Sequence, residues 1–186
     1  MMRKIAARLR GTSTATRIVV AITAAAALAA IIAASVIPGG SAAAPQPEPL
    51  ARNFTLPELG HPADRVRLAS YAGKPVIINF FASWCAPCKR ETPLLARFYA
   101  SHHGKVLMIG VDSNDETAQA LRFVKAAGIT YPVGFDPSPM RVTLSYDVMA
   151  LPQTFFLNAQ HRIVKRVYGD VTMHTLTVGV DLMDRR

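Results

Sequence analysis

Cys85 and Cys88 are the only cysteines of this 186-residue chain, and they lie three positions apart. The uncharged run at residues 76–81 precedes them and predicts a buried strand, and a predicted helix begins directly after Cys85. A helix N-terminus carries partial positive charge and free backbone N–H groups, which favour a thiolate over a thiol. Because the thiolate is the reactive form of cysteine, this placement predicts thiol–disulfide exchange.

Purely structural uses of the cysteine pair are disfavoured. A disulfide across three positions closes a very short loop and therefore constrains the unfolded chain little. A structural zinc site needs four ligands, yet the chain has no second cysteine pair and its five histidines show no ligand spacing. Pro87, between the cysteines, fixes one backbone angle and is expected to hold them near disulfide geometry. The sequence thus predicts a redox-active disulfide with no metal and no cofactor.

Glu91 is a candidate for proton exchange with the dithiol. On a helical projection it shares one face with Cys88, Leu95 and Phe98, which is the face expected to pack on the core. Burial raises the pKa of a carboxyl group, so Glu91 is expected to exchange a proton with Cys88 near neutral pH. The alternative is that Glu91 belongs to a solvated edge formed by residues 89–91.

The elements that must position these residues alternate along the chain. Strands are predicted at 54–56, 66–68, 75–81, 106–111, 131–135, 154–157 and 163–167. Helices are predicted at 86–101, 114–127, 139–145 and 172–183, the second of them starting at a capping box in residues 113–116 and ending at Gly128. This order predicts an α/β fold with a mixed central sheet, helices on both faces and an N-terminal β addition.

The first 52 residues predict three segments that precede the folded domain. Residues 1–17 carry five basic side chains and no acidic one, so this segment is expected to stay in the cytoplasm. Residues 18–37 contain no charge and are long enough to cross a bilayer as a helix. Residues 38–52 are rich in proline and alanine and predict an extended linker. The domain, at 53–186, is therefore expected outside the cytoplasm.

The apolar segment at 18–37 is either an uncleaved membrane anchor or the core of a signal peptide. Residues 42–44 are alanines and fit a signal-peptidase site, and the weak hydrophobicity of the segment favours cleavage. The apolar run and the basic segment are both longer than those of a usual signal peptide, which favours the anchor. We expect a single-pass anchor in the cell membrane, whereas cleavage would give a secreted or periplasmic domain.

The strong positive charge belongs largely to the N-terminal end. The chain has 21 basic and 12 acidic residues and a net charge of +9. Five of the basic residues precede the apolar segment, which leaves 16 basic against 12 acidic residues and a net charge of +4 after it. This balance is that of an ordinary solvated surface, so no nucleic-acid partner is expected.

Residues 79–93 and 146–157 resemble the thioredoxin superfamily, and within it the membrane-tethered TlpA/ResA/CcmG-type thiol–disulfide oxidoreductases. The first block holds the dithiol and the strand before it, and the second ends in Leu-Pro-Gln-Thr-Phe-Phe-Leu. The likeness covers about residues 53–183. Residues 113–135 resemble the α/β insertion that separates this branch from plain thioredoxin. The resemblance therefore implies a thioredoxin-like fold.

The resemblance also implies roles for individual residues. Cys85 would be the attacking thiol and Cys88 the resolving thiol. Pro152 would be in the cis form and packed against the disulfide, which leaves the backbone of Leu151 free to pair with a substrate peptide. Trp84 would shield the dithiol and offer substrates a flat apolar contact, with plain packing as the alternative.

Asn79 marks a departure from plain thioredoxin. It occupies the strand position where thioredoxins place a buried acid, and an amide cannot carry protons in the same way. The departure transfers proton exchange to Glu91 or to water. The alternative is a hydrogen-bonded strand residue with no part in the chemistry.

The implied activity is extracytoplasmic reduction of protein disulfides, with apocytochrome c as a substrate during cytochrome c maturation and a CcdA/DsbD-like membrane protein as electron donor. Three alternatives stay open: a disulfide-forming oxidase, a thiol peroxidase and a non-catalytic copper-binding or copper-delivery module. Ala82 disfavours the peroxidase, because the usual peroxidatic setting has Thr three residues before the reactive Cys. A copper module would need a His or Met set, for which Met149, three residues before Pro152, is the candidate.

Overall fold

The computed structural model describes residues 48–102 and 104–185. The predicted cytoplasmic segment, the apolar segment at 18–37 and the alanines at 42–44 lie outside the described residues. Within the described part, no helix is long and apolar enough to cross a membrane. The anchor and the signal peptide therefore both stay predictions.

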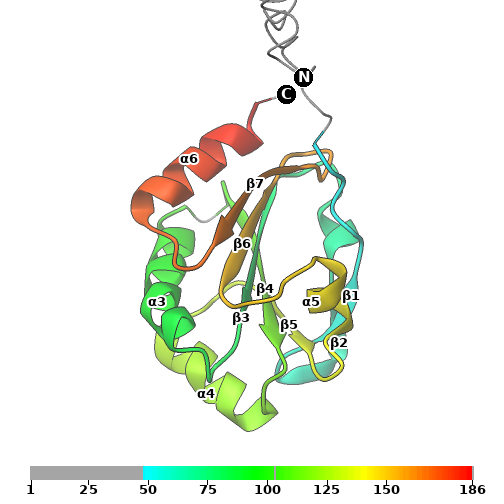
Figure 1. Ribbon diagram of the computed structural model, residues 1–186, viewed down its shortest axis with the longest axis vertical. Coiled ribbons are helices and arrows are strands. Elements are labelled where there is room, and N and C mark those ends of the chain that lie inside the picture. The colour runs from blue at the N-terminus through cyan, green and yellow to red at the C-terminus, as the bar shows by residue number, and fades with distance from the viewer. Residues whose placement is uncertain (1–47, 103, 186) are drawn as a thin grey trace, which may run out of the picture. The chain divides into compact units, whose positions relative to one another are not determined.

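A seven-stranded sheet forms the centre of the domain, in the spatial order β2-β1-β5-β4-β3-β6-β7 (Figure 1). The strands are β1 (Thr55–Glu58), β2 (His61–Arg67), β3 (Val76–Phe81), β4 (Leu107–Ser113), β5 (Val133–Asp136), β6 (Gln153–Leu157) and β7 (Ile163–Tyr168). β3, β4 and β5 run parallel, whereas β1, β2, β6 and β7 pair antiparallel with their neighbours. The predicted mixed sheet with an N-terminal β addition is confirmed.

Helices cover both faces of the sheet, as predicted (Figure 1). They are the short 3-10 helix η2 (Leu68–Tyr71), α3 (Ala86–Ser101), α4 (Thr117–Ala127), α5 (Arg141–Ser145) and α6 (Met173–Met183). One apolar core lies between the sheet and α3, α4 and α6, and the other lies between the sheet and α5 and η2. The parallel strands are those whose connections run through α3 and α4, because a parallel pair needs a crossover.

β3 is the strand that leads to the dithiol, and all six of its residues are buried. Its side chains alternate between the two cores, with Ile77 and Phe81 on the side of α3 and Ile78 and Phe80 on the side of α5. Asn79 lies between them in sequence and therefore points toward α3. This polar position in an otherwise apolar strand is where the site is built.

The predicted start of the second helix is wrong. Ser113 is the last residue of β4, and its hydroxyl is hydrogen-bonded to the Thr143 hydroxyl at 2.8 Å, so it caps no helix. α4 begins at Thr117 with Glu116 as its N-cap, and no side chain caps it. The predicted end is confirmed, because Gly128 is the C-cap in the left-handed conformation with φ 71°.

α6 forms although its threonines and Gly179 favour helix weakly. The side chain of Thr172 accepts a hydrogen bond from Thr175 N–H at 3.2 Å, and the Thr175 hydroxyl accepts one from Thr172 N–H at 2.7 Å. This reciprocal capping box starts the helix. A Cβ at Gly179 would lie 2.1 Å from a ring carbon of Phe156, so this position requires glycine for α6 to reach the sheet.

The folded unit starts before residue 53. Leu50 pairs with Arg162 as an isolated antiparallel bridge, and the N–H of Ala51 donates to the carbonyl of His161 at 2.8 Å. The last part of the predicted linker, residues 48–52, therefore packs beside the β6–β7 connection. These contacts are made by backbone groups, which the proline-rich composition of the segment does not reveal.

Candidate functional site

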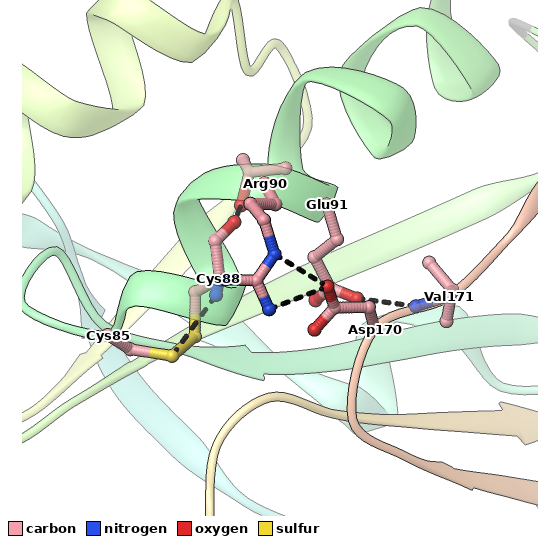
Figure 2. Close-up of polar contacts among 7 residues, drawn as sticks. Cys85, Cys88, Arg90, Glu91, Asp170 and Val171 are labelled. Carbon is pink, nitrogen blue, oxygen red and sulfur yellow. Dashed lines mark hydrogen bonds and ion pairs between the residues drawn. A yellow bond between two sulfur atoms is a disulfide. The ribbon is translucent and has the colours of Figure 1, made fainter.

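The two cysteines form a disulfide at the N-terminus of α3 (Figure 2). Cys85 is the N-cap residue, and its Sγ accepts a hydrogen bond from the N–H of Cys88 at 3.2 Å. The first turn of α3 contains no acidic residue, so the positive end of the helix faces the sulfur atoms unopposed. This arrangement favours a thiolate at Cys85 once the disulfide is reduced.

The two sulfur-bearing residues differ in access to solvent. Cys85 is 5% exposed and belongs to the apolar cluster against which Leu151 packs. Cys88 is 0% exposed. The small exposed part therefore belongs to Cys85, and a partner sulfur can approach the pair only from that side.

Glu91 lies in the core, 2% exposed, although its neighbours Lys89 and Arg90 are exposed. Its Oε1 accepts a hydrogen bond from Asn79 Nδ2 at 2.9 Å. Its Oε2 accepts one from the N–H of Val171 at 2.8 Å (Figure 2). The alternative of a solvated edge is therefore wrong for Glu91 itself. The helical stripe indicated burial, whereas both hydrogen-bond donors come from distant parts of the chain.

Burial is the main reason why the pKa of Glu91 is raised to about 7. The hydrogen bonds from Val171 and Asn79 stabilise the carboxylate and oppose the rise in pKa, and the negative charge of Asp170 adds to it. A carboxyl group with a pKa near neutral can both give and take a proton at physiological pH. It lies one helical turn beyond Cys88 on the same face of α3.

Asn79 joins β3 to the site and to β6. Its Nδ2 donates to Glu91 and also to the hydroxyl of Thr154 at 3.0 Å. Thr154 is fully buried and directly opposes Asn79 in the antiparallel β3–β6 register. Asn79 therefore orients the carboxyl group of Glu91, which is a contact that sequence reasoning did not identify.

An ion pair closes the site on the solvent side. Arg90 on α3 contacts Asp170 at 3.1 Å, in the loop that follows β7 (Figure 2). Asp170 directly precedes Val171, whose N–H binds Glu91. The pair is partly exposed, so it contributes little to stability and serves mainly to hold this loop beside α3.

The loop before β6 faces the dithiol. The Leu151–Pro152 peptide bond is cis, as the resemblance implies. Leu151 packs against the apolar cluster that contains both cysteines. A groove of ≈ 180 Å³ runs beside it, lined by Trp84, Asn114, Met140, Thr143, Met149 and Leu151 among others.

Trp84 borders this groove, and its expected role as a shield of the dithiol stays a prediction. Its side chain is 57% exposed, and its Nε1–H donates to the carbonyl of Asn114 at 2.9 Å. The ring is therefore held at the surface by the segment after β4. Its expected role as an apolar contact for substrates stays a prediction.

Arg166 on β7 binds residues on both sides of the cis-proline loop. Sequence reasoning did not identify this residue. Its guanidinium donates two hydrogen bonds to Gln153 Oε1, at 2.8 and 3.0 Å, and one to the carbonyl of Asp147 at 2.7 Å. Gln153 in turn donates to the carbonyl of Ala150 at 3.0 Å. The side chain lies over the ring of Phe155, 4.7 Å from its centroid. A bidentate Arg–Gln pair is not visible as a sequence motif.

Among residues 48–102 and 104–185, no group of three or more His, Cys, Asp or Glu side chains is placed to hold a metal ion. Met140 and Met149 line the same groove beside Trp84. These two thioethers are the residues on which the copper alternative would depend.

Residues 48–166 match the AhpC/TSA family. The chain belongs to the AhpC/TSA family. The thiol–disulfide oxidoreductase ResA of Bacillus subtilis (strain 168) is 34% identical over 123 residues, which cover 66% of this chain and 67% of the relative. ResA of Halalkalibacterium halodurans is 32% identical over 134 residues, covering 72% of this chain and 74% of the relative.

Solved structures agree with this relationship. The crystal structure of a DsbF homologue from Corynebacterium diphtheriae matches with a TM-score of 0.66 and 29% identity, covering 78% of this chain and 95% of that chain. The resemblance to TlpA/ResA/CcmG-type proteins is thereby confirmed. With its disulfide at the N-terminus of α3, this AhpC/TSA-family chain is a thiol–disulfide oxidoreductase with a thioredoxin-like fold.

Proposed function

We propose that the chain reduces protein disulfides outside the cytoplasm through Cys85 and Cys88. The thiolate of Cys85 attacks one sulfur of a substrate disulfide, the substrate S–S bond breaks, and the departing sulfur takes up a proton. Cys88 then attacks Cys85 Sγ, which releases the second substrate thiol. The chain loses two electrons and ends with the Cys85–Cys88 disulfide. The difference in exposure between the two cysteines supports this order of attack.

Glu91 is proposed as the proton-exchange group for Cys88. Resolution requires Cys88 to lose its proton only when the mixed disulfide has formed. A carboxyl group with a pKa of about 7, one turn along α3, can accept that proton in a region closed to bulk water. This buried carboxyl group is the observation that carries the proposal of a reductant, because it disfavours a second negative charge on the thiols.

The cellular setting follows from the N-terminal segment and from the relatives. An uncharged segment at 18–37 behind five basic residues supports a membrane anchor with the domain outside. We propose apocytochrome c as a substrate and a CcdA/DsbD-like membrane protein as electron donor. Mass spectrometry of the native protein tests the anchor: an intact N-terminus in the membrane fraction supports it, and an N-terminus at Pro45 identifies a cleaved signal peptide.

Reduction of insulin by the full-length chain, with dithiothreitol as donor, tests the catalytic roles. Cys85→Ser is expected to abolish the reaction, because no attacking thiolate is left. Cys88→Ser is expected to accumulate mixed disulfides that a non-reducing gel detects, because the resolving thiol is missing. Undiminished activity of Cys85→Ser would refute the assignment and favour a binding module instead.

A further inference from the structure

Asp112 is a second buried acid, and the chemistry described above does not use it. It lies near the end of β4, is 0% exposed, and pairs in register with Phe81 on β3 and Phe135 on β5. Neither carboxyl oxygen of Asp112 has a hydrogen-bond donor among the described residues. An ionised carboxylate in this position would be desolvated and unpartnered, which is strongly unfavourable.

Asp115 lies beside Asp112 and binds the turn that carries the dithiol. Its Oδ2 accepts a hydrogen bond from the N–H of Ser83, and its Oδ1 accepts one from the Ser83 hydroxyl at 2.8 Å. The preceding residue, Asn114, accepts the hydrogen bond from Trp84 Nε1. The segment after β4 thus holds both residues that directly precede Cys85.

A single proton allows Asp112 and Asp115 to lie side by side as a hydrogen-bonded pair. When Asp112 is protonated, its hydroxyl can donate to the carboxylate of Asp115, which satisfies an otherwise unpartnered buried group. Burial, the charge of Asp115 and this hydrogen bond together raise the pKa of Asp112 to about 8.

Other charged groups near the pair do not neutralise it. Lys89 on α3 and Arg122 on α4 line a hollow of ≈ 280 Å³ together with Ser83, and neither forms an ion pair with Asp112 in the described part of the chain. Glu116 is exposed. Asp136, at the end of β5, binds the N–H and hydroxyl of Thr143, both at 2.7 Å, on the side of α5.

We propose that Asp112 and Asp115 are positioning residues that share one proton and thereby hold the turn of residues 83–85 in place for reaction at Cys85. Loss of the shared proton puts two negative charges side by side. Asp115 is the more exposed of the two and moves toward water, which releases Ser83 and Trp84. The proposal rests on Cys85 as the attacking thiol.

The full-length chain carries its own reporter, because Trp84 is its only tryptophan. The fluorescence of Trp84 is recorded in the oxidised chain, where neither cysteine titrates, from neutral to alkaline pH. We expect one transition centred near pH 8 in the wild type. Asp112→Asn keeps the shape and a donor for Asp115 but cannot ionise, so the transition should disappear. Glu91→Gln is the matched control and should retain it.

The pH dependence of activity tests whether the pair positions the turn for reaction at Cys85. The ratio of the insulin-reduction rate of Asp112→Asn to that of the wild type is expected to rise severalfold as the pH passes through 8. Titration of the cysteines affects both proteins and cancels in this ratio. Asp115→Asn removes the carboxylate of the more exposed member of the pair, so it should also abolish the fluorescence transition. This variant replaces Asp112→Asn if Asp112→Asn does not fold.

Two results would overturn the proposal. One is a Trp84 signal that shows no transition in the wild type or an unchanged transition in Asp112→Asn. The other is a rate ratio that does not change with pH. The fluorescence test is made on the oxidised chain and needs no turnover, so its outcome is separate from any failure of the proposed reductase activity.

Discussion

A glutamate inside the core is the residue that sets this dithiol apart from a bare Cys-x-x-Cys motif. Glu91 occupies the apolar face of α3, where a hydrophobic side chain would be the default, and two donors hold its carboxyl group. Because burial raises its pKa to about 7, the group is neither permanently charged nor permanently neutral at physiological pH. This property suits proton exchange with Cys88.

Glu91→Gln tests this role at the scale of the residue. Removing the carboxyl group is expected to lower the pKa of the cysteine thiols, since a nearby negative charge disfavours a second one. The reduction potential should rise and insulin reduction near neutral pH should slow severalfold. Thiolate absorbance as a function of pH measures the first effect.

Asp181→Asn, an isosteric change of an exposed acid on α6, is the control for Glu91→Gln and should leave the thiol titration unchanged. If Glu91→Gln and wild type titrate alike, Glu91 only fills space in the core, and its proton-exchange role fails.

At the scale of elements, the cis-proline loop is held by β7 as well as by its own backbone. Arg166 reaches from β7 to Gln153 and to the carbonyl of Asp147, on either side of the segment that presents Leu151. The planar guanidinium makes these bonds simultaneously, which a lysine ammonium cannot do. The loop is therefore positioned by a long-range contact.

Arg166→Lys is expected to raise KM for a protein disulfide about three- to tenfold, because it loses one or two charge-assisted hydrogen bonds. The reduction potential of the dithiol should not change, since Arg166 does not contact the cysteines. Arg162→Lys, which alters an arginine whose guanidinium donates to the carbonyl of Glu48, is the matched control. A shifted potential with normal KM would contradict the positioning role.

The sequence predicted the features that depend on local patterns and missed those that depend on contacts between distant residues. Hydrophobic periodicity indicated β3, α3 and the burial of Glu91, because these depend on local patterns. The start of α4 was missed because Ser113 and Asp115 bind Thr143 and Ser83, which are distant in sequence, and do not cap the helix. Asn79 was noted as a departure, but its contact with Glu91 becomes visible only in the fold.

At the scale of the whole molecule, the buried acids make stability depend on pH. Burial raises the pKa of Glu91 from 4.5 to about 7 and that of Asp112 from 3.8 to about 8. At a pH between the pKa of each acid in the unfolded chain and its pKa in the folded chain, the folded chain keeps a proton that the unfolded chain has released. Each such proton lowers the free energy of unfolding by ~1.4 kcal/mol per pH unit as the pH rises through this interval.

The oxidised full-length chain is therefore expected to be more stable at pH 5 than at pH 8, with no further loss from these groups above pH 8. Urea unfolding at several pH values measures this. In Glu91→Gln, the free energy of unfolding should depend less steeply on pH between pH 4.5 and pH 7. An identical dependence in the variant and the wild type would show that Glu91 ionises freely in the folded state.

The reduction potential of the Cys85–Cys88 pair, measured against a glutathione or dithiothreitol series, tests the central claim most directly. A reductant whose buried carboxyl group disfavours thiolates should have a potential near that of thioredoxin, ~−270 mV. A potential near ~−120 mV would contradict the account, because it would assign the chain to disulfide formation.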